Sequence, residues 1–171
     1  VIPAFASGLD GRPAIDAYFR DGERTRIDCL LSLTGFSLVG GPAYNDSRAA
    51  IEALETIDVP YLAAHPSEFQ SLEQWADSSR GLTPIETTMM VALPELDGAT
   101  GPLVYAGQKD MDSKGDQDKF PIEERVERLA DRVVRLAALR RKPRRERRLG
   151  IVLFNFPPNA GAVGTAAHLA V

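Results

Sequence analysis

The chain has 171 residues, of which 44% are hydrophobic and 26% are charged, a composition typical of a folded soluble domain. Its net charge of -4 argues against a protein devoted to nucleic acid, which would carry an excess of Lys and Arg. The longest apolar runs are far shorter than the about 20 residues of a membrane-spanning helix, so we expect no transmembrane segment. A single cysteine, Cys29, cannot form an internal disulfide, which favours a reducing, cytoplasmic compartment.

Both ends of the chain lie in apolar runs, Val1–Phe5 and Ala166–Val171. Natural termini are usually polar and frayed. We therefore expect the 171 residues to be an internal piece of a much longer subunit, folded as a single α/β domain or segment.

Short apolar runs alternate with amphipathic stretches along the whole chain, which predicts strands followed by helices. The predicted strands cover residues 1–7, 27–33, 59–65, 102–106 and 149–155. Nearly continuous apolar strands separated by helices are typical of a parallel sheet that is covered on both faces. The predicted fold class is therefore α/β and doubly wound, with a mainly parallel sheet of about five strands and helices on both faces.

The helices are predicted from apolar periodicity and from capping residues. Asp46 is placed to cap a helix that runs through Ile57. Two capping-box patterns, Ser67 with Gln70 and Thr83 with Glu86, predict two further helix starts, and Pro94 is expected to stop the second of these helices. Other helices are expected at residues 13–19, in a long amphipathic helix that opens at 121, and at the end of the chain.

Five loops follow the predicted strands, and ligands of parallel sheets bind beyond the carboxyl ends of the strands. These loops are Ser7–Arg12, Thr34–Pro42, His65–Ser67, Gly107–Asp110 and Asn155–Thr165. The second and the fifth are richest in glycine, which lets backbone amides approach a ligand. Gly161–Thr165 also opens a helix whose free N–H groups favour an anion, although a tight turn without a ligand has the same pattern. No nucleotide-binding fingerprint is present.

Three side chains are candidates for catalysis. Glu95 and Asp97 lie two residues apart and would suit a hard cation or proton transfer, but a turn that simply exposes both acids is the simpler interpretation. His65 ends a predicted strand at the ligand-binding edge and could move a proton near neutral pH; a hydrogen-bonded structural histidine is the alternative. Two His and one Cys do not have the spacing of a zinc site, so no bound metal is expected.

A basic segment ends the long predicted helix. Residues 121–148 carry 11 basic and five acidic side chains, and seven of the basic ones lie between Arg140 and Arg148. Positive charge near a helix C-terminus is favourable, so a solvated helix end explains the pattern. The alternative is a docking patch for an acidic partner or for another part of the same chain.

Four stretches, taken together and in this order, resemble the family of the magnesium chelatase and cobaltochelatase large subunits. They are Phe5–Asp10, Ser32–Ala43, Val91–Gly98 and Phe156–Ala167. Within the last, Val163–Ala167 is similar to the magnesium branch, whereas the cobalt branch tends to have a Gly-Asn-Gly pattern there. The resemblance covers nearly the whole chain.

The resemblance implies a subunit several times longer that binds protoporphyrin IX and works with two smaller subunits, one of them an AAA+ ATPase. Such an enzyme is a ligase that inserts Mg²⁺ at the expense of ATP, on the way to chlorophyll or bacteriochlorophyll. The family's His-Gly-x-x-Glu signature is expected beyond Val171, so the segment alone is expected to be inactive. A cytoplasmic location is implied, or one peripheral to photosynthetic membranes, in the stroma if the protein is from a plastid.

The porphyrin is a flat apolar ring with two propionates, which requires an apolar slot and anion-binding groups. The residues expected to contribute to this site are Thr34, Gly35, Phe36, Gly40, Gly41, Asn159, Gly161, Gly164 and Thr165. Two alternatives stay open at this point. One is a cobaltochelatase large-subunit segment of cobalamin biosynthesis, and the other is a stand-alone α/β module that binds a small anion.

Overall fold

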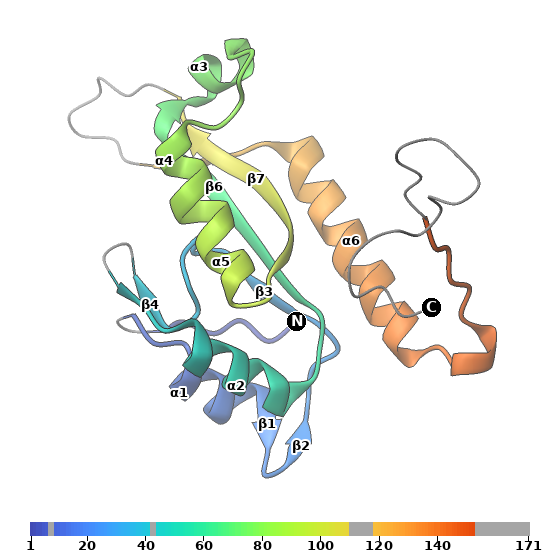
Figure 1. Cartoon of the computed structure of the whole chain (residues 1–171). Helices are drawn as coiled ribbons and strands as arrows, with labels where there is room; N and C mark the ends of the chain where they lie inside the picture. The colour runs from blue at the N-terminus through green and yellow to red at the C-terminus, as the bar shows by residue number, and fades with distance from the viewer. Residues whose placement is uncertain (7–8, 42–43, 110–117, 153–171) are drawn as a thin grey trace, which may run out of the picture. The chain divides into compact units, whose positions relative to one another are not determined.

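A computed structural model describes residues 1–6, 9–41, 44–109 and 118–152 (Figure 1). The chain divides into two units, Val1–Arg141 and Lys142–Val171. All strands named below belong to the first unit. Within the described residues, no helix combines the length and the apolar composition needed to cross a membrane.

The main sheet contains four strands in the order β3 (Leu30–Ser32), β6 (Tyr61–Ser71), β7 (Thr100–Gln108) and β8 (Phe120–Pro121). β3 and β7 are parallel to β6, and β8 is antiparallel to β7. The fold class is therefore α/β with a mainly parallel sheet, as predicted, but the described sheet has four strands instead of about five. The short β8, which contains a proline, was not predicted.

Two predicted strands are wrong where the structure describes them. Residues 1–6 of the first are not in a strand, and neither are residues 149–152 of the last; the rest of both lies outside the described residues. Instead, four two-residue strands form two hairpins. β1 (Arg20–Asp21) pairs with β2 (Arg24–Thr25), and β4 (Gly40–Gly41) pairs with β5 (Tyr44–Asn45).

β6 does not end at His65 as predicted but continues through Pro66 to Ser71. β3 pairs only with Tyr61–Ala63, so beyond that point β7 is the strand that pairs with β6 in the described chain. Proline is tolerated where one side of a strand has no ladder partner. The pairing with β7 also shifts register around Pro66, which absorbs the missing N–H donor.

Helices at the start and middle of the chain follow the predictions with two exceptions. α1 (Arg12–Ala14) continues into η1 (Ile15–Phe19), and α2 (Ser47–Ile57) is capped by Asp46, as predicted. α3 (Leu72–Asp77) is capped by Ser71 and Gln74, not by Ser67 and Gln70, because Ser67 is buried within β6. The sequence repeats the same Ser-x-x-Gln spacing four residues later, so spacing alone could not distinguish the two sites.

The second exception is the helix that begins at the Thr83 and Glu86 capping box. It runs as α4 (Pro84–Glu86), η2 (Thr87–Ala92) and α5 (Leu93–Leu96), so Pro94 does not stop it. The π-helical turns of η2 end two residues before the proline, and such turns accommodate local departures from the usual hydrogen-bond ladder.

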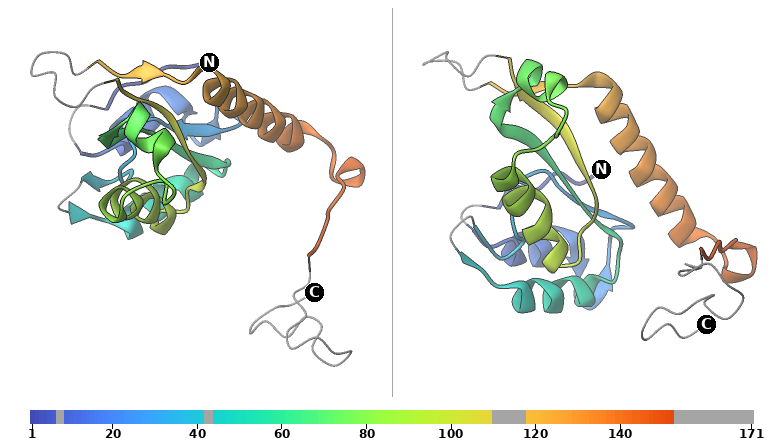
Figure 2. Two further views of the ribbon diagram at one scale, coloured as in Figure 1. Left: turned by 90° about the horizontal axis from the view of Figure 1, so that it is seen from above. Right: turned by 45° about the horizontal axis from the view of Figure 1, so that its top comes forward.

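The long amphipathic helix is present as α6 (Glu123–Arg141). It packs against β7, its buried residue is Leu129, and the Arg132 guanidinium donates to the Gly101 carbonyl at 2.6 Å. Figures 1 and 2 show α6 on one side of β7 and the helix from α4 to α5 on the other. This arrangement agrees with the prediction of helices on both faces of the sheet. In the second unit, η3 (Arg144–Glu146) is the described helix.

The main apolar core lies between the start of the sheet, η1 and α2. Its buried members are Ile15, Phe19, Leu30, Leu54, Ile57, Tyr61, Ala63 and Ala99, with Leu38 packed against them. This core supports the loop that leaves β3.

Candidate functional site around the glycine-rich loop

The candidate site is built on residues Thr34–Gly41, called here the glycine-rich loop. The loop leaves the sheet after Ser32, which pairs with Ala63 of β6. β6 and β7 continue together from there to the pair of Ser71 with Gln108. The segments after β3 and after β7 therefore leave the sheet at different levels. Two of the five predicted loops are wrong where the structure describes them, because residues 65–67 belong to β6 and residues 107–108 belong to β7.

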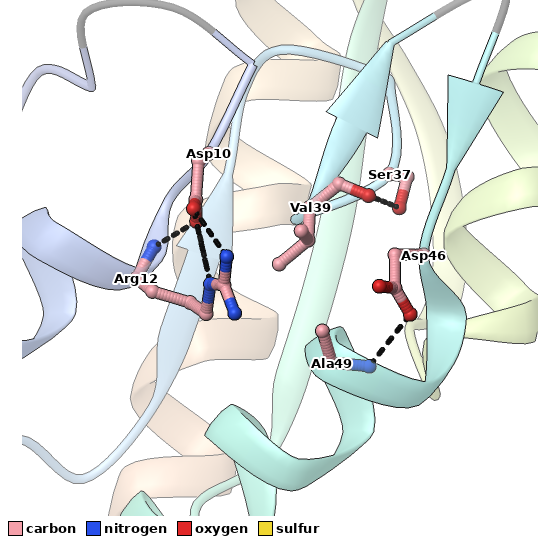
Figure 3. A network of polar contacts seen from close by, with 6 residues as sticks. All are labelled: Asp10, Arg12, Ser37, Val39, Asp46 and Ala49. Carbon is pink, nitrogen blue, oxygen red and sulfur yellow. Dashed lines mark hydrogen bonds and ion pairs between the residues drawn. The ribbon is translucent and has the colours of Figure 1, made fainter.

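The first two predicted loops do meet. The Gly11 N–H donates to the Leu38 carbonyl at 2.8 Å, and the Gly40 N–H donates to the Leu9 carbonyl. Asp10 and Val39 form an antiparallel bridge between these contacts. Residues 9–11 thus run alongside residues 38–40, and Figure 3 shows Asp10 and Val39 in the resulting network.

The opposite flank of the loop is held by the start of α2. The Asp46 N–H donates to the Val39 carbonyl at 2.8 Å. The Asp46 carboxylate accepts from the Ala49 N–H at 3.0 Å, as Figure 3 shows. One residue therefore caps the helix and connects it to the loop. In the neighbouring segment, Arg12 forms a bidentate pair with Asp10, and this hydrogen bonding lowers the pKa of Asp10.

Gly35 lets the loop approach the sheet closely. Its backbone has a φ of 71°, and a Cβ atom there would lie 2.6 Å from the Cβ of His65 and 2.7 Å from the Sδ of Met90. Those distances are too short for any side chain, so only glycine fits without a shift. Gly40 and Gly41 are buried in β4, and Gly40, with a φ of 122°, would clash with the backbone of Tyr44 if it carried a side chain. Packing within the protein is thus sufficient to explain these glycines.

Asp97 anchors the loop from the turn that precedes β7. It is only 1% exposed, and its Oδ2 atom accepts from the Leu38 N–H at 2.7 Å and from the Ser37 hydroxyl at 2.8 Å. Glu95, by contrast, is exposed. The expectation that one turn exposes both acids is therefore wrong, and the two carboxylates do not converge on a common cation.

His65 lies in the middle of β6 and not at a strand end. It is 1% exposed, and its Nδ1 donates to the Pro66 carbonyl at 3.0 Å. Burial lowers the pKa of His65, which favours the neutral ring at physiological pH. With Gly35 packed over it, this side chain forms the floor of the loop, which matches the structural interpretation of the residue.

Glu86 is a buried polar residue that the sequence analysis identified only as a capping residue. It is 0% exposed and accepts hydrogen bonds from Thr83, Phe69, Gln70 and Ser67. Burial would raise the pKa of Glu86, but these hydrogen bonds outweigh burial and lower it. The carboxylate thus joins the end of β6 to the start of α4. The capping pattern gave no signal of this role, because Ser67, Phe69 and Gln70 lie 16 or more residues from Glu86 in the sequence.

The side chains that the loop leaves accessible are at its start. Thr34 is exposed, Phe36 is half-buried, and the preceding Leu33 is 47% exposed. The expected site residues Asn159, Gly161, Gly164 and Thr165 lie outside the described residues. Among the residues that are described, no group of three or more His, Cys, Asp or Glu is arranged to hold a metal ion.

Taken together, the fold and the loop define an α/β segment that presents a loop fixed by contacts from four directions. Comparison with known proteins gives the family. Residues 1–171 match the model of the CobN/Magnesium Chelatase family, and the chain belongs to that family.

Three relatives show which branches are similar. The chain is 60% identical over 185 residues to the magnesium-chelatase H subunit of Cereibacter sphaeroides and 46% identical over 173 residues to the chloroplastic magnesium-chelatase ChlH subunit of Oryza sativa subsp. indica. It is 36% identical over 152 residues to the aerobic cobaltochelatase CobN subunit of Pseudomonas aeruginosa. The matches cover 100%, 100% and 86% of this chain.

The same matches cover only 16%, 12% and 12% of the relatives, so the chain spans about a sixth or less of their length. No solved structure matches the chain.

Proposed function

We propose that the chain is a segment of the large, porphyrin-binding subunit of a magnesium chelatase. The proposed reaction is the insertion of Mg²⁺ into protoporphyrin IX, driven by ATP that a partner AAA+ subunit hydrolyses, in chlorophyll or bacteriochlorophyll biosynthesis. The single observation that carries the proposal is the 60% identity to a magnesium-chelatase large subunit over the whole chain. The lower identity of 36% to a cobaltochelatase subunit favours magnesium over cobalt.

Within this subunit, we assign the glycine-rich loop to porphyrin binding. A porphyrin presents a large flat apolar face, and a binding site for it needs exposed apolar side chains on a rigid support. Leu33 and Phe36 supply partly exposed apolar surface at the start of the loop, and Thr34 between them supplies a hydroxyl. The buried contacts of Ser37, Gly35 and Leu38 supply the rigid support.

Removal of the two pyrrole protons needs bases that can reach the porphyrin. Two of the three candidate bases in this segment are buried. Asp97 is buried and bound to the loop, and His65 is buried and bound to the Pro66 carbonyl of its own strand, while Glu95 is the exposed member of the three candidates. We therefore assign proton removal and metal delivery to the rest of the large subunit, and we expect the 171-residue chain alone to have no chelatase activity. The location proposed for the enzyme is the cytoplasm or stroma, including the surface of photosynthetic membranes.

The test is a fluorescence-quenching titration of protoporphyrin IX with the complete large subunit that contains this chain. Phe36→Ala should weaken porphyrin affinity by about tenfold, because a lost aromatic contact is commonly worth about 1 to 2 kcal/mol. Val134→Ala is the matched control, since Val134 is 66% exposed on α6 and no porphyrin contact is assigned to it. If the Phe36→Ala and wild-type titrations coincide, the loop does not bind porphyrin.

The choice of metal has its own test. The complete subunit is combined with the smaller subunits of a magnesium chelatase or of a cobaltochelatase, each with its metal, tetrapyrrole and ATP. Turnover with Mg²⁺ and protoporphyrin IX alone supports the proposal. Turnover with cobalt and a corrinoid ring alone would assign the chain to the cobalt branch.

A further inference from the structure

The turn at Asp97 holds a buried carboxylate that does not use all of its hydrogen-bonding capacity. Oδ2 accepts two hydrogen bonds from the glycine-rich loop, whereas Oδ1 is buried and has no partner in the described part of the chain. A buried polar atom without a partner is unfavourable by itself. Only Oδ2 therefore contributes stabilising hydrogen bonds, and the burial of Oδ1 is not explained by a gain in stability.

The contacts of Oδ2 fall on the middle of the loop. The Ser37 hydroxyl has one hydrogen, and its oxygen lies 2.8 Å from Asp97 Oδ2 and 3.1 Å from the Val39 carbonyl oxygen. The Leu38 N–H points to the same carboxylate, while the Leu38 carbonyl accepts from Gly11. Leu38 is thus the residue of the loop that is bound both to residues 9–11 and, through Asp97, to the turn before β7.

Tyr61 lies in the same buried region. Its hydroxyl forms no hydrogen bond of normal geometry within the described residues. Burial and the nearby charge of Asp97 raise the pKa of Tyr61 to about 12, and the Ser32 side chain offsets this only in part. Two buried polar atoms of the described chain, the Tyr61 hydroxyl oxygen and Asp97 Oδ1, thus lack a normal hydrogen bond, although Tyr61 belongs to the apolar core.

We propose that Asp97 is a positioning residue for the porphyrin site, because it fixes the Ser37–Val39 backbone before the ligand arrives. This inference rests on the proposed function, since it assumes that the loop binds the porphyrin. A loop held in its binding conformation loses less conformational entropy when the ligand binds. The carboxylate does not contact the ligand; it acts through Ser37 and Leu38.

Three variants of the complete large subunit test this proposal. Asp97→Ala removes both hydrogen bonds, and Ser37→Ala removes one. Asp97→Asn keeps an oxygen that can accept from both donors, while its new N–H₂ group takes the position of the unpartnered Oδ1. Asp131→Ala is the matched control, because Asp131 is an exposed carboxylate on α6. Two readouts are taken for each variant: hydrogen exchange of the peptide that covers residues 34–41, and the Kd for protoporphyrin IX.

Asp97→Ala should accelerate exchange of the loop peptide by about 10- to 100-fold, the range that the loss of hydrogen bonds to a charged group implies. It should also weaken porphyrin binding about tenfold. Ser37→Ala should produce a smaller change in the same direction, and it keeps the test valid if Asp97→Ala does not fold. In Asp97→Asn both readouts should stay within about threefold of wild type, because the amide oxygen still accepts the two hydrogen bonds. If Asp97 acted through its charge alone, this variant would instead be as defective as Asp97→Ala.

The outcomes separate the two claims. Unchanged loop exchange in Asp97→Ala and Ser37→Ala overturns the positioning role. Faster exchange with an unchanged Kd shows that Asp97 holds the loop but that the loop does not bind porphyrin, which overturns the assignment of porphyrin binding to the loop. An Asp97→Asn variant as defective as Asp97→Ala would mean that the charge matters and the hydrogen bonds do not, which also contradicts the proposal.

Discussion

Two regions of the first unit use charged side chains in opposite ways. Around the glycine-rich loop and the end of β6, Asp97 and Glu86 are buried and bind backbone and side-chain donors of other segments. Along α6, the pairs of Glu124 with Arg128 and Asp131 with Arg135 lie on an exposed face. Buried groups depend on their partners far more than exposed pairs do, so the same kind of substitution should have large effects in the first region and small ones in the second.

The largest effect is expected at Gly35. Gly35→Ala places a Cβ atom against His65 and Met90 in a backbone conformation that disfavours side chains, and it should lower the free energy of unfolding by about 3 kcal/mol or more. Gly81 is the matched control, because its φ of 75° is nearly the same and nothing lies within 4 Å of its Cβ position. Gly81→Ala should cost about 1 kcal/mol. Urea denaturation of the 171-residue chain gives both values, and equal losses would mean that the close contact does not constrain the loop.

A large effect that depends on pH is expected at Glu86. The pKa of Glu86 is lowered in the folded state, so its stabilisation is complete above its ordinary value of 4.5 and is lost as the pH falls through the folded pKa. Glu86→Gln should lower the free energy of unfolding at pH 7 by about 2 to 3 kcal/mol, because its amide faces donors that need an acceptor. Below about pH 4 the difference from wild type should shrink. Urea unfolding of wild type and Glu86→Gln at several pH values from acidic to neutral measures this difference in the free energy of unfolding. A difference that does not change with pH would contradict the role given to the carboxylate.

A small effect is expected at Tyr61. Because its hydroxyl is buried without a normal hydrogen bond, Tyr61→Phe should change the free energy of unfolding by less than about 1 kcal/mol and can increase it. The comparison variant is Tyr61→Leu, which also removes the ring from the core and should be clearly destabilising. A large loss in Tyr61→Phe, measured by the same denaturation, would show that the hydroxyl has a partner of energetic importance.

The smallest effect on porphyrin affinity is expected in the basic segment. Arg140 and Arg141 pair with Asp58 and Asp28 in the first unit, whereas Arg144, Arg145, Arg147 and Arg148 are exposed side chains of the second. Replacing these four with Gln should leave the porphyrin Kd unchanged.

The same four substitutions should slow association with acidic partner surfaces in a salt-dependent way, because exposed charges are screened over about 8 Å at physiological ionic strength. Stopped-flow association rates of the complete subunit with its smaller partners, measured at several NaCl concentrations, test this. If the rates of wild type and variant coincide at every salt concentration, the segment is a solvated helix end and not a docking patch.

The features that the sequence predicted correctly depend on neighbours within a few residues. The Asp46 cap and the Thr83 and Glu86 capping box were found because the groups involved lie within one helical turn. The continuation of β6 past Pro66 was missed because it depends on how far β3 extends beside it. Local patterns carry no information on the length of a neighbouring strand.

The burial of Asp97 was missed for a similar reason. Ser37 and Asp97 are 60 residues apart in the sequence, and only the folded sheet brings them together. The chain did indicate the loop itself, since glycines between two strands mark a close backbone approach. It did not indicate that His65 and Met90 lie directly beneath Gly35, because that contact joins three separate elements.

Hydrogen exchange of the complete large subunit, with and without protoporphyrin IX, tests the central claim most directly. If the anchored loop binds the porphyrin, amides of residues 33–41 should exchange more slowly when the ligand is added, while those of α6 stay unchanged. Porphyrin-induced protection confined to other parts of the subunit, with no change in residues 33–41, would contradict the account.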